Sequence, residues 1–202
     1  LAFILLGAVC FTIKNHDPVG LPWKLLAAFG AVHGVYEWLH LLALSIGDAP
    51  AFDLLRLMLM AASYASLLEF ARLGAIRLGM KAPGRWIYAP LFLSIALAGV
   101  FGGLNSANAV ARYALGLPGG IGAGLVFARL SKGLSGSERR WVVCVAVGLA
   151  LYGIAAGVIV PATISPTRNA TVAARHTVTT RNRRVMFTII GLPVPLQQLE
   201  KG

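Results

Sequence analysis

A series of long apolar segments separated by short loops limits the folds open to this chain more than any other feature of its sequence. A helix needs about 20 consecutive, mostly apolar residues to cross the hydrocarbon core of a bilayer. Hydrophobic residues make up 57% of the chain and charged residues 12%, whereas soluble domains carry about 45–50% and about 25%. The sequence therefore predicts an all-α, polytopic transmembrane helix bundle. We expect its helices at residues 1–13, 21–46, 53–73, 86–104, 107–130 and 141–164.

The start of the chain and its helix-breaking residues add detail to these predicted helices. The chain begins at Leu1 inside an apolar run and without a methionine, so we expect it to be a fragment of a longer protein. Pro118, followed by two glycines, predicts a kink inside the fifth helix. Residues 1–164 form the predicted transmembrane bundle and residues 165–202 a basic tail. The apolar stretch 185–199 predicts the start of a truncated seventh helix.

The charges of the loops predict an orientation. The net charge is +11, and most of the cations near the bundle fall in the 3–4 and 5–6 loops, whereas the 2–3 loop carries only aspartates. Short loops rich in lysine and arginine remain in the cytoplasm. We therefore expect these two loops in the cytoplasm, and the 2–3 loop and the start of the chain outside. Nucleic acid is not an expected partner, because the cations follow loops rather than a soluble face with interleaved aromatic residues.

The stretch HGVYEWLH, residues 33–40, places ionisable groups inside a predicted membrane helix. His33, Glu37 and His40 are spaced to share one helical face, with Tyr36 and Trp38 between them. Ionisable residues within a membrane usually face the interior of the bundle and pair with one another. Three interpretations follow: a polar network that fixes helix packing, a pocket that receives a ligand or signal, and a metal or haem site on the three ionisable residues.

A partner for this cluster is predicted on the fifth helix. Arg112 lies in its first turns, at a depth that Glu37 could meet, so we predict an ion pair between the two. The alternative is that Arg112 reaches outward to the lipid headgroups. Nearer the cytoplasm, the spacing of Glu69 and Arg72 predicts a local ion pair.

Other residues in the bundle have structural interpretations. Tryptophans at cytoplasmic helix ends predict interfacial anchors, and closely spaced glycines in the fifth helix predict close packing of helices. The two cysteines form no metal-binding pattern and are expected to pack as small side chains. These residues are Trp23, Trp86, Trp141, Gly116, Gly119, Gly120, Gly122, Gly124, Cys10 and Cys144.

Four phrases carry a resemblance to a known class of membrane region. They are AAFGAVHGVYEWLHLL at 27–42, SYASLLEFAR at 63–72, ARYALGLPGGIGAGL at 111–125 and FTIIGLPVPLQQL at 187–199. In this order they resemble the multi-pass sensor region found N-terminal to bacterial histidine kinases and diguanylate cyclases. The most specific pieces include His33-Gly34, Glu37-Trp38 and Arg112-Tyr113.

The resemblance implies a signal-sensing module that passes a packing change to a cytoplasmic output domain in cis, of the PAS, kinase or GGDEF/EAL type. It also implies a bacterial inner-membrane location. Taking these motifs together with the shared polar face and its expected partner on the fifth helix, we predict as ligand- or signal-binding residues His33, Tyr36, Glu37, Trp38, His40, Arg112 and Tyr113. The other expected partners are the lipid bilayer and a second copy of the chain. The sequence shows no phosphate loop, GxSxG or HExxH motif, so we do not expect this region to be an enzyme itself. It specifies no cofactor, and a small transporter remains the alternative to the sensor, beside the metal or haem site.

Overall fold

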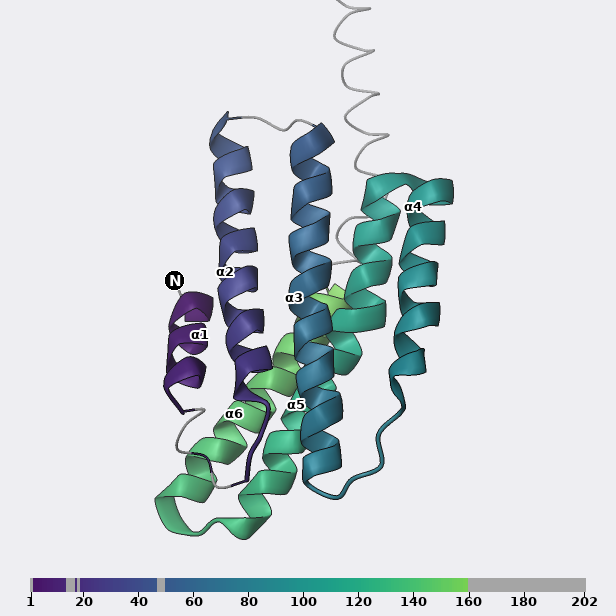
Figure 1. Cartoon of the computed structure of the whole chain (residues 1–202). Coiled ribbons are helices and arrows are strands. Elements are labelled where there is room, and N and C mark those ends of the chain that lie inside the picture. Colours follow the sequence, from purple (N-terminus) through teal and green to yellow (C-terminus); the bar gives the residue numbers. More distant parts are fainter. Residues whose placement is uncertain (1, 14–16, 18, 47–49, 160–202) are drawn as a thin grey trace, which may run out of the picture. The chain divides into compact units, whose positions relative to one another are not determined.

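The computed structural model describes residues 2–13, 17, 19–46 and 50–159, and all the regular elements in these ranges are helical (Figure 1). The all-α prediction is confirmed. The predicted basic tail and seventh helix lie outside the described residues. The α-helices are α1 (Ala2–Ile13), α2 (Trp23–Ile46), α3 (Pro50–Arg77), α4 (Tyr88–Ala111), α5 (Leu117–Leu130) and α6 (Gly136–Ile154). The 3₁₀ segments are η1 (Arg85–Ile87) and η3 (Ser131–Gly133), and the π-helical segments are η2 (Arg112–Gly116) and η4 (Ala155–Ile159).

In the described part of the chain, four helical stretches are long and apolar enough to cross a membrane, as the sequence predicts for a membrane protein. They are Trp23–Ala43, Ala51–Arg77, Arg85–Gly133 and Gly136–Val158. The helix α1 is also apolar but shorter. The structure extends α3 beyond its predicted bounds at both ends and starts α6 at Gly136 rather than at Trp141. The added turn of α6 carries Glu138, Arg139 and Arg140, so it is not part of an apolar run.

The longest stretch contains a reversal of the chain at Gly103. This residue has φ 73° and ψ −178°, a backbone conformation that is open essentially to glycine alone. A Cβ atom built on Gly99 would lie 3.5 Å from the Cβ of Ala107, a contact that two residues eight positions apart in a straight helix could not make. The two arms of α4 therefore run back against each other (Figure 1). The sequence predicts a helix end within one residue of this point.

The predicted irregularity at Pro118 takes the form of a widened turn just before it. Proline lacks the N–H that would bond to the carbonyl four residues back, and its ring would clash with that carbonyl. In η2 the backbone N–H of Leu117 donates instead to the carbonyl of Arg112, five residues back. Such π-helical turns change the direction in which the preceding side chains point. The turn thereby aims Arg112 into the bundle, where it is buried.

Glycines allow the closest helix approaches, as predicted for α5. A Cβ on Gly120 would lie 2.5 Å from the Cα of Gly153, so α5 and α6 touch backbone to backbone at this point. The same holds where α1 crosses α2, because a Cβ on Gly30 would lie 2.6 Å from the carbonyl oxygen of Phe3. Close backbone approach through small residues is how membrane helices gain packing contacts without a hydrophobic driving force.

The positively charged side chains gather at one end of the bundle. The start of α2 and the connections that follow α3 and α5 lie at this end, while the end of α2, the start of α3 and the reversal in α4 lie at the other (Figure 1). We call it the basic end, and it carries Arg77, Lys81, Arg85, Arg129, Lys132, Arg139 and Arg140. This distribution matches the loop charges on which the predicted orientation rests.

One predicted interfacial anchor is packed inside the protein. Trp86 and Trp141 are 72% and 71% exposed, as anchors in the headgroup region would be, but Trp23 is buried. The Nε1–H of Trp23 donates to the carboxylate of Asp17 at 2.7 Å, and its ring packs against Phe70. The carboxylate supplies a polar partner inside the protein, so this indole does not need the membrane surface. The prediction that Trp23 is an interfacial anchor therefore differs from the structure.

Candidate functional site: a buried polar network

His33 lies at the centre of a buried polar cluster, about 15 Å along α2 from its first residue at 1.5 Å per residue. Its Nδ1 is 3.0 Å from the Ser63 hydroxyl on α3, and its Nε2 is 2.9 Å from the Tyr152 hydroxyl on α6. The Ser63 hydroxyl donates its hydrogen to the backbone carbonyl of Met60, at 2.7 Å. The His33 Nδ1–H therefore donates to Ser63, which leaves Nε2 to accept from Tyr152.

Aromatic rings enclose the imidazole of His33. The ring of Phe3 on α1 stands edge-on to it with centroids 4.6 Å apart, and the centroid of the Phe29 ring is 5.3 Å away. Tyr36 and Tyr64 add ring contacts at 5.3 and 5.4 Å. His33 is 2% exposed as a result. The imidazole is thus held by hydrogen bonds at both nitrogens and by rings around it.

Arg112 forms the second centre of the cluster, and its hydrogen-bond partners are neutral oxygens. Its Nε donates to the Asn108 side chain at 2.8 Å, and one terminal nitrogen donates to the Tyr36 hydroxyl at 2.9 Å. The other terminal nitrogen is 3.4 Å from the Tyr64 hydroxyl. A buried guanidinium needs several such partners, because taking an unpaired charge out of water is expensive.

The two centres form one continuous network. The hydroxyls of Tyr64 and Tyr152 are 3.5 Å apart and join the Arg112 side to the His33 side. In the described part of the chain, no buried side-chain nitrogen or oxygen is left without a hydrogen-bond partner. The network connects α2, α3, η2 and α6. We call it the central network, and it consists of His33, Tyr36, Ser63, Tyr64, Arg112 and Tyr152.

The predicted ion pair between Glu37 and Arg112 is not formed. Each of Arg112's three nitrogens has one of the neutral partners described above, and the Glu37 side chain is 50% exposed. Glu37 instead approaches His33, with 3.7 Å between the Glu37 Oε1 and the His33 Nε2. The reason is rotational: the buried face of α2 passes through His33 and Tyr36, so Glu37 falls at its edge.

The remaining predicted site residues lie outside the central network. Trp38 and Tyr113 are 53% and 45% exposed on the outside of the bundle. His40 is also exposed, and its Nδ1 is 3.5 Å from Arg56, which forms an ion pair with Asp53. The structure therefore brings His33, Tyr36 and Arg112 together, holds Glu37 at the margin and separates the other three.

Sequence reasoning missed three members of the network. Ser63, Tyr64 and Tyr152 carry no charge, so a search for ionisable residues in the membrane passes over them. A usable signal does exist, because tyrosines in membrane helices concentrate at the interfaces and Tyr64 stands in the middle of α3. A tyrosine at that depth needs a hydrogen-bond partner.

A second, smaller polar cluster lies near the basic end. The carboxylate of Glu69 accepts two hydrogen bonds from Arg72, at 2.7 and 2.8 Å, which is the local pair that the spacing predicts. The Tyr88 hydroxyl also donates to Glu69, at 2.7 Å, and the Arg85 guanidinium lies 3.6 Å away. This cluster ties the start of α4 to α3.

The described residues contain no group of three or more histidine, cysteine or acidic side chains placed to hold a metal ion. No protein-family model, curated protein or solved structure matches this chain. The geometry of the central network is therefore the observation on which a functional proposal has to rest.

Proposed function

We propose that this chain is a membrane-embedded signal-receiving module, and that the central network is the part that responds to the signal. What supports this proposal is that one set of interdependent hydrogen bonds joins four helical elements in the middle of the bundle. A network that only filled space could be replaced by apolar side chains of the same volume. A polar network in a membrane protein, by contrast, is expensive to maintain and usually marks a functional pathway.

The network offers a simple way to turn a local change into a change of packing. Each hydroxyl has one hydrogen to give, so the direction of one bond restricts the next. If Nε2 of His33 gained a hydrogen, it could no longer accept from Tyr152 and would instead donate towards Glu37, 3.7 Å away. Tyr152 would then need a new acceptor. The signal could be a proton or a small ligand that competes for one of these positions.

The packing around the network suggests how such a change would travel. The π-helical segments η2 and η4 contact each other, and α5 meets α6 through Gly120 and Gly153. At this point the two helices meet through backbone atoms, so a small displacement of one is felt directly by the other. We infer that a shift at Arg112 or Tyr152 moves α5 against α6 and so reaches the basic end.

The finer architecture belongs to the same proposal. We infer that the stretch Arg85–Gly133 crosses the membrane twice, with Gly103 at the outer surface and the basic end in the cytoplasm. With α1 as part of a further crossing, the bundle has six helices. We propose a bacterial inner-membrane location, an output domain in the same polypeptide on the cytoplasmic side, and pairing of two copies of the chain.

Two matched serines test the proposal. Ser63 and Ser94 both lie within helices, and each donates to a carbonyl three residues back at 2.7 Å, but only Ser63 also holds His33. In the full-length gene product, Ser63→Ala should change the output of the kinase or cyclase domain by about fivefold or more, the usual scale of coupling between sites. Ser94→Ala should leave it unchanged.

Membrane levels of both variants, measured by immunoblot, separate an effect on signalling from loss of the protein. Equal output from Ser63→Ala and the wild type at equal levels would contradict the proposal. So would a full-length coding sequence that contains no output domain, or purified protein that moves a solute across proteoliposomes.

A further inference from the structure

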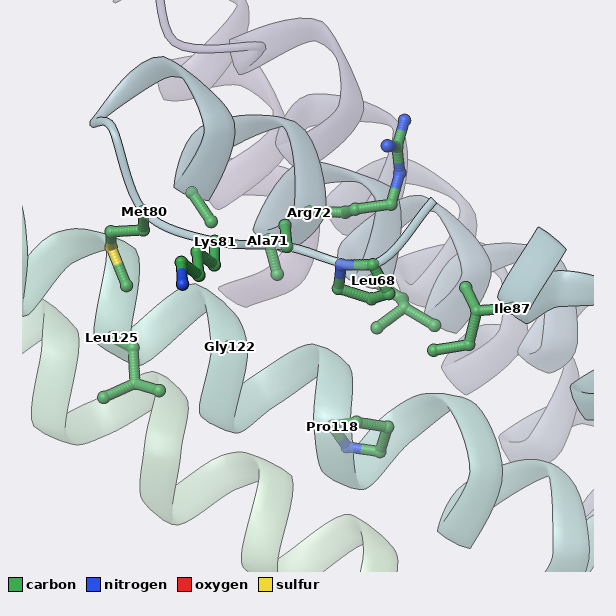
Figure 2. Close-up of a pocket in the computed structure, with 12 residues that line it drawn as sticks. Leu68, Ala71, Arg72, Met80, Lys81, Ile87, Pro118, Gly122 and Leu125 are labelled. Carbon is green, nitrogen blue, oxygen red and sulfur yellow. The ribbon is translucent and has the colours of Figure 1, made fainter. Parts of the chain in front are cut away.

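An apolar pocket lies near the basic end, between α3, the connection 78–84 and α5 (Figure 2). Its volume is about 250 Å³. Leu68, Ala71 and Ala75 on α3 are buried at its floor, whereas Lys81 and Leu125 on its rim are exposed. The pocket is therefore open at the surface and closed by the protein behind.

The size and lining of this pocket suit a slender apolar group. Pockets for drug-sized ligands typically measure about 300–1,000 Å³, and this one is smaller. Its lining is aliphatic apart from Arg72 and Lys81. A hydrocarbon chain has the right width and chemistry, and the membrane around the protein supplies such chains at high concentration.

The charges beside the pocket indicate a negative headgroup. Two of the three guanidinium nitrogens of Arg72 donate to the Glu69 carboxylate, so this pair contributes little net charge. Lys81 forms no ion pair with any other described residue. Arg85, 78% exposed, adds a second positive charge beside Glu69. Figure 2 shows Lys81 on the same side of the pocket as Leu125, with Arg72 directed away.

We propose that this pocket binds one acyl chain of an anionic phospholipid, whose phosphate contacts Lys81 on its rim. The apolar span of α3 ends at Arg77, so the connection 78–84 lies at the depth where headgroups would lie. Basic pockets at the cytoplasmic ends of membrane helices favour anionic lipids for this reason. The bound chain packs against α3, the connection 78–84 and α5 where these meet at the basic end. This site does not depend on the signal-receiving role of the central network.

Lipid titration of the purified full chain in detergent, followed by native mass spectrometry, tests the proposal. Phosphatidylglycerol should bind more tightly than phosphatidylcholine with the same acyl chains. Lys81→Gln should weaken phosphatidylglycerol binding about fivefold, which corresponds to about 1 kcal/mol per cation near an anionic surface. The matched control is Lys132→Gln, an exposed lysine at the same end that does not line the pocket.

A second variant tests the acyl-chain half of the site. Ala82 lines the pocket from the connection, so Ala82→Phe should fill it and weaken phosphatidylglycerol binding while circular dichroism shows an unchanged helix content. Equal binding of the two lipids would overturn the proposal, as would a loss in Lys132→Gln that equals the loss in Lys81→Gln. Undiminished binding in Ala82→Phe would also overturn it, and so would thermal stabilisation by inorganic phosphate equal to that by the lipid.

Discussion

At the scale of the residue, two tyrosines differ in burial and in hydrogen bonding, because one belongs to the central network and the other does not. Tyr36 is buried and its hydroxyl accepts a hydrogen bond from Arg112 at 2.9 Å, whereas Tyr113 is 45% exposed and makes no described hydrogen bond. Removing the Tyr36 hydroxyl leaves a buried guanidinium nitrogen without a partner. Hydrogen bonds to charged groups contribute about 1.5–3 kcal/mol.

We therefore predict that Tyr36→Phe lowers the free energy of unfolding by about 1.5–3 kcal/mol, because of that lost bond. Tyr113→Phe should change it by less than about 0.5 kcal/mol, as surface substitutions do. Denaturant unfolding of both variants in mixed micelles, followed by circular dichroism, provides the comparison. Equal effects of the two substitutions would mean that the Tyr36–Arg112 hydrogen bond does not contribute to the free energy of unfolding.

A second residue-scale prediction concerns Trp23. Its Nε1–H donates to Asp17, which also accepts the backbone N–H groups of Val19 and Leu21 before α2 begins. Trp23→Phe removes one of these bonds and part of a buried ring, so we expect a loss of about 1–3 kcal/mol in the free energy of unfolding. The exposed Trp141→Phe is its control, and the same unfolding measurement applies. A Trp23→Phe protein as stable as Trp141→Phe would show that the indole is held by the membrane surface after all.

Single residues also show where sequence reasoning reaches its limit. Charge identified His33 and Arg112 as residues that need partners, and the period of the helix placed Tyr36 near them. Nothing in a one-dimensional pattern says which uncharged side chains on other helices complete the set, so Ser63, Tyr64 and Tyr152 became visible only in three dimensions. The rotation of α2 decided against the Glu37–Arg112 pair, because His33 and Tyr36 together define its buried face.

At the scale of the element, we expect replacement of glycine by alanine to have opposite effects on stability at two positions. Gly103 has a backbone conformation closed to other residues, and we expect Gly103→Ala to destabilise the reversal in α4 by about 1–3 kcal/mol. Gly148 is helical, and a Cβ there meets nothing within 4 Å. Gly148→Ala should stabilise α6 by roughly 0.5–1 kcal/mol through a lower conformational entropy of the unfolded chain. Thermal unfolding of the two variants measures the direction of each change in stability. A Gly103→Ala protein more stable than the wild type would contradict the chain reversal at this residue.

The helices themselves were largely predictable, because the membrane requires length and apolarity of each. Their ends were less predictable, since α6 begins in a charged turn outside the apolar run and α3 extends past its predicted bounds at both ends. The irregularity at Pro118 was predictable from the missing N–H. Its form as a π-helical turn, and the resulting direction of Arg112, depend on packing against α3 and α6.

At the scale of the whole molecule, the proposed orientation predicts where reporters will be found. Alkaline phosphatase and green fluorescent protein, fused after Arg77 or Lys132, should report the cytoplasm, because both sites lie at the basic end. Fusions after Asp48 and after Gly103 should report the outside. A reversed result at two of these positions would contradict the orientation and the cytoplasmic output that depends on it.

The central claim is that the state of the network sets the packing of helices at the basic end, and a distance across that end measures it most directly. Nitroxide labels can be placed at Arg77 and Lys132, after Cys10 and Cys144 are replaced by alanine, in protein reconstituted into nanodiscs. Double electron–electron resonance should then show a shifted or broadened distance distribution in Ser63→Ala and Arg112→Gln, and an unchanged one in Ser94→Ala. Identical distributions in all folded variants would show that the network only packs the bundle, and would contradict the account.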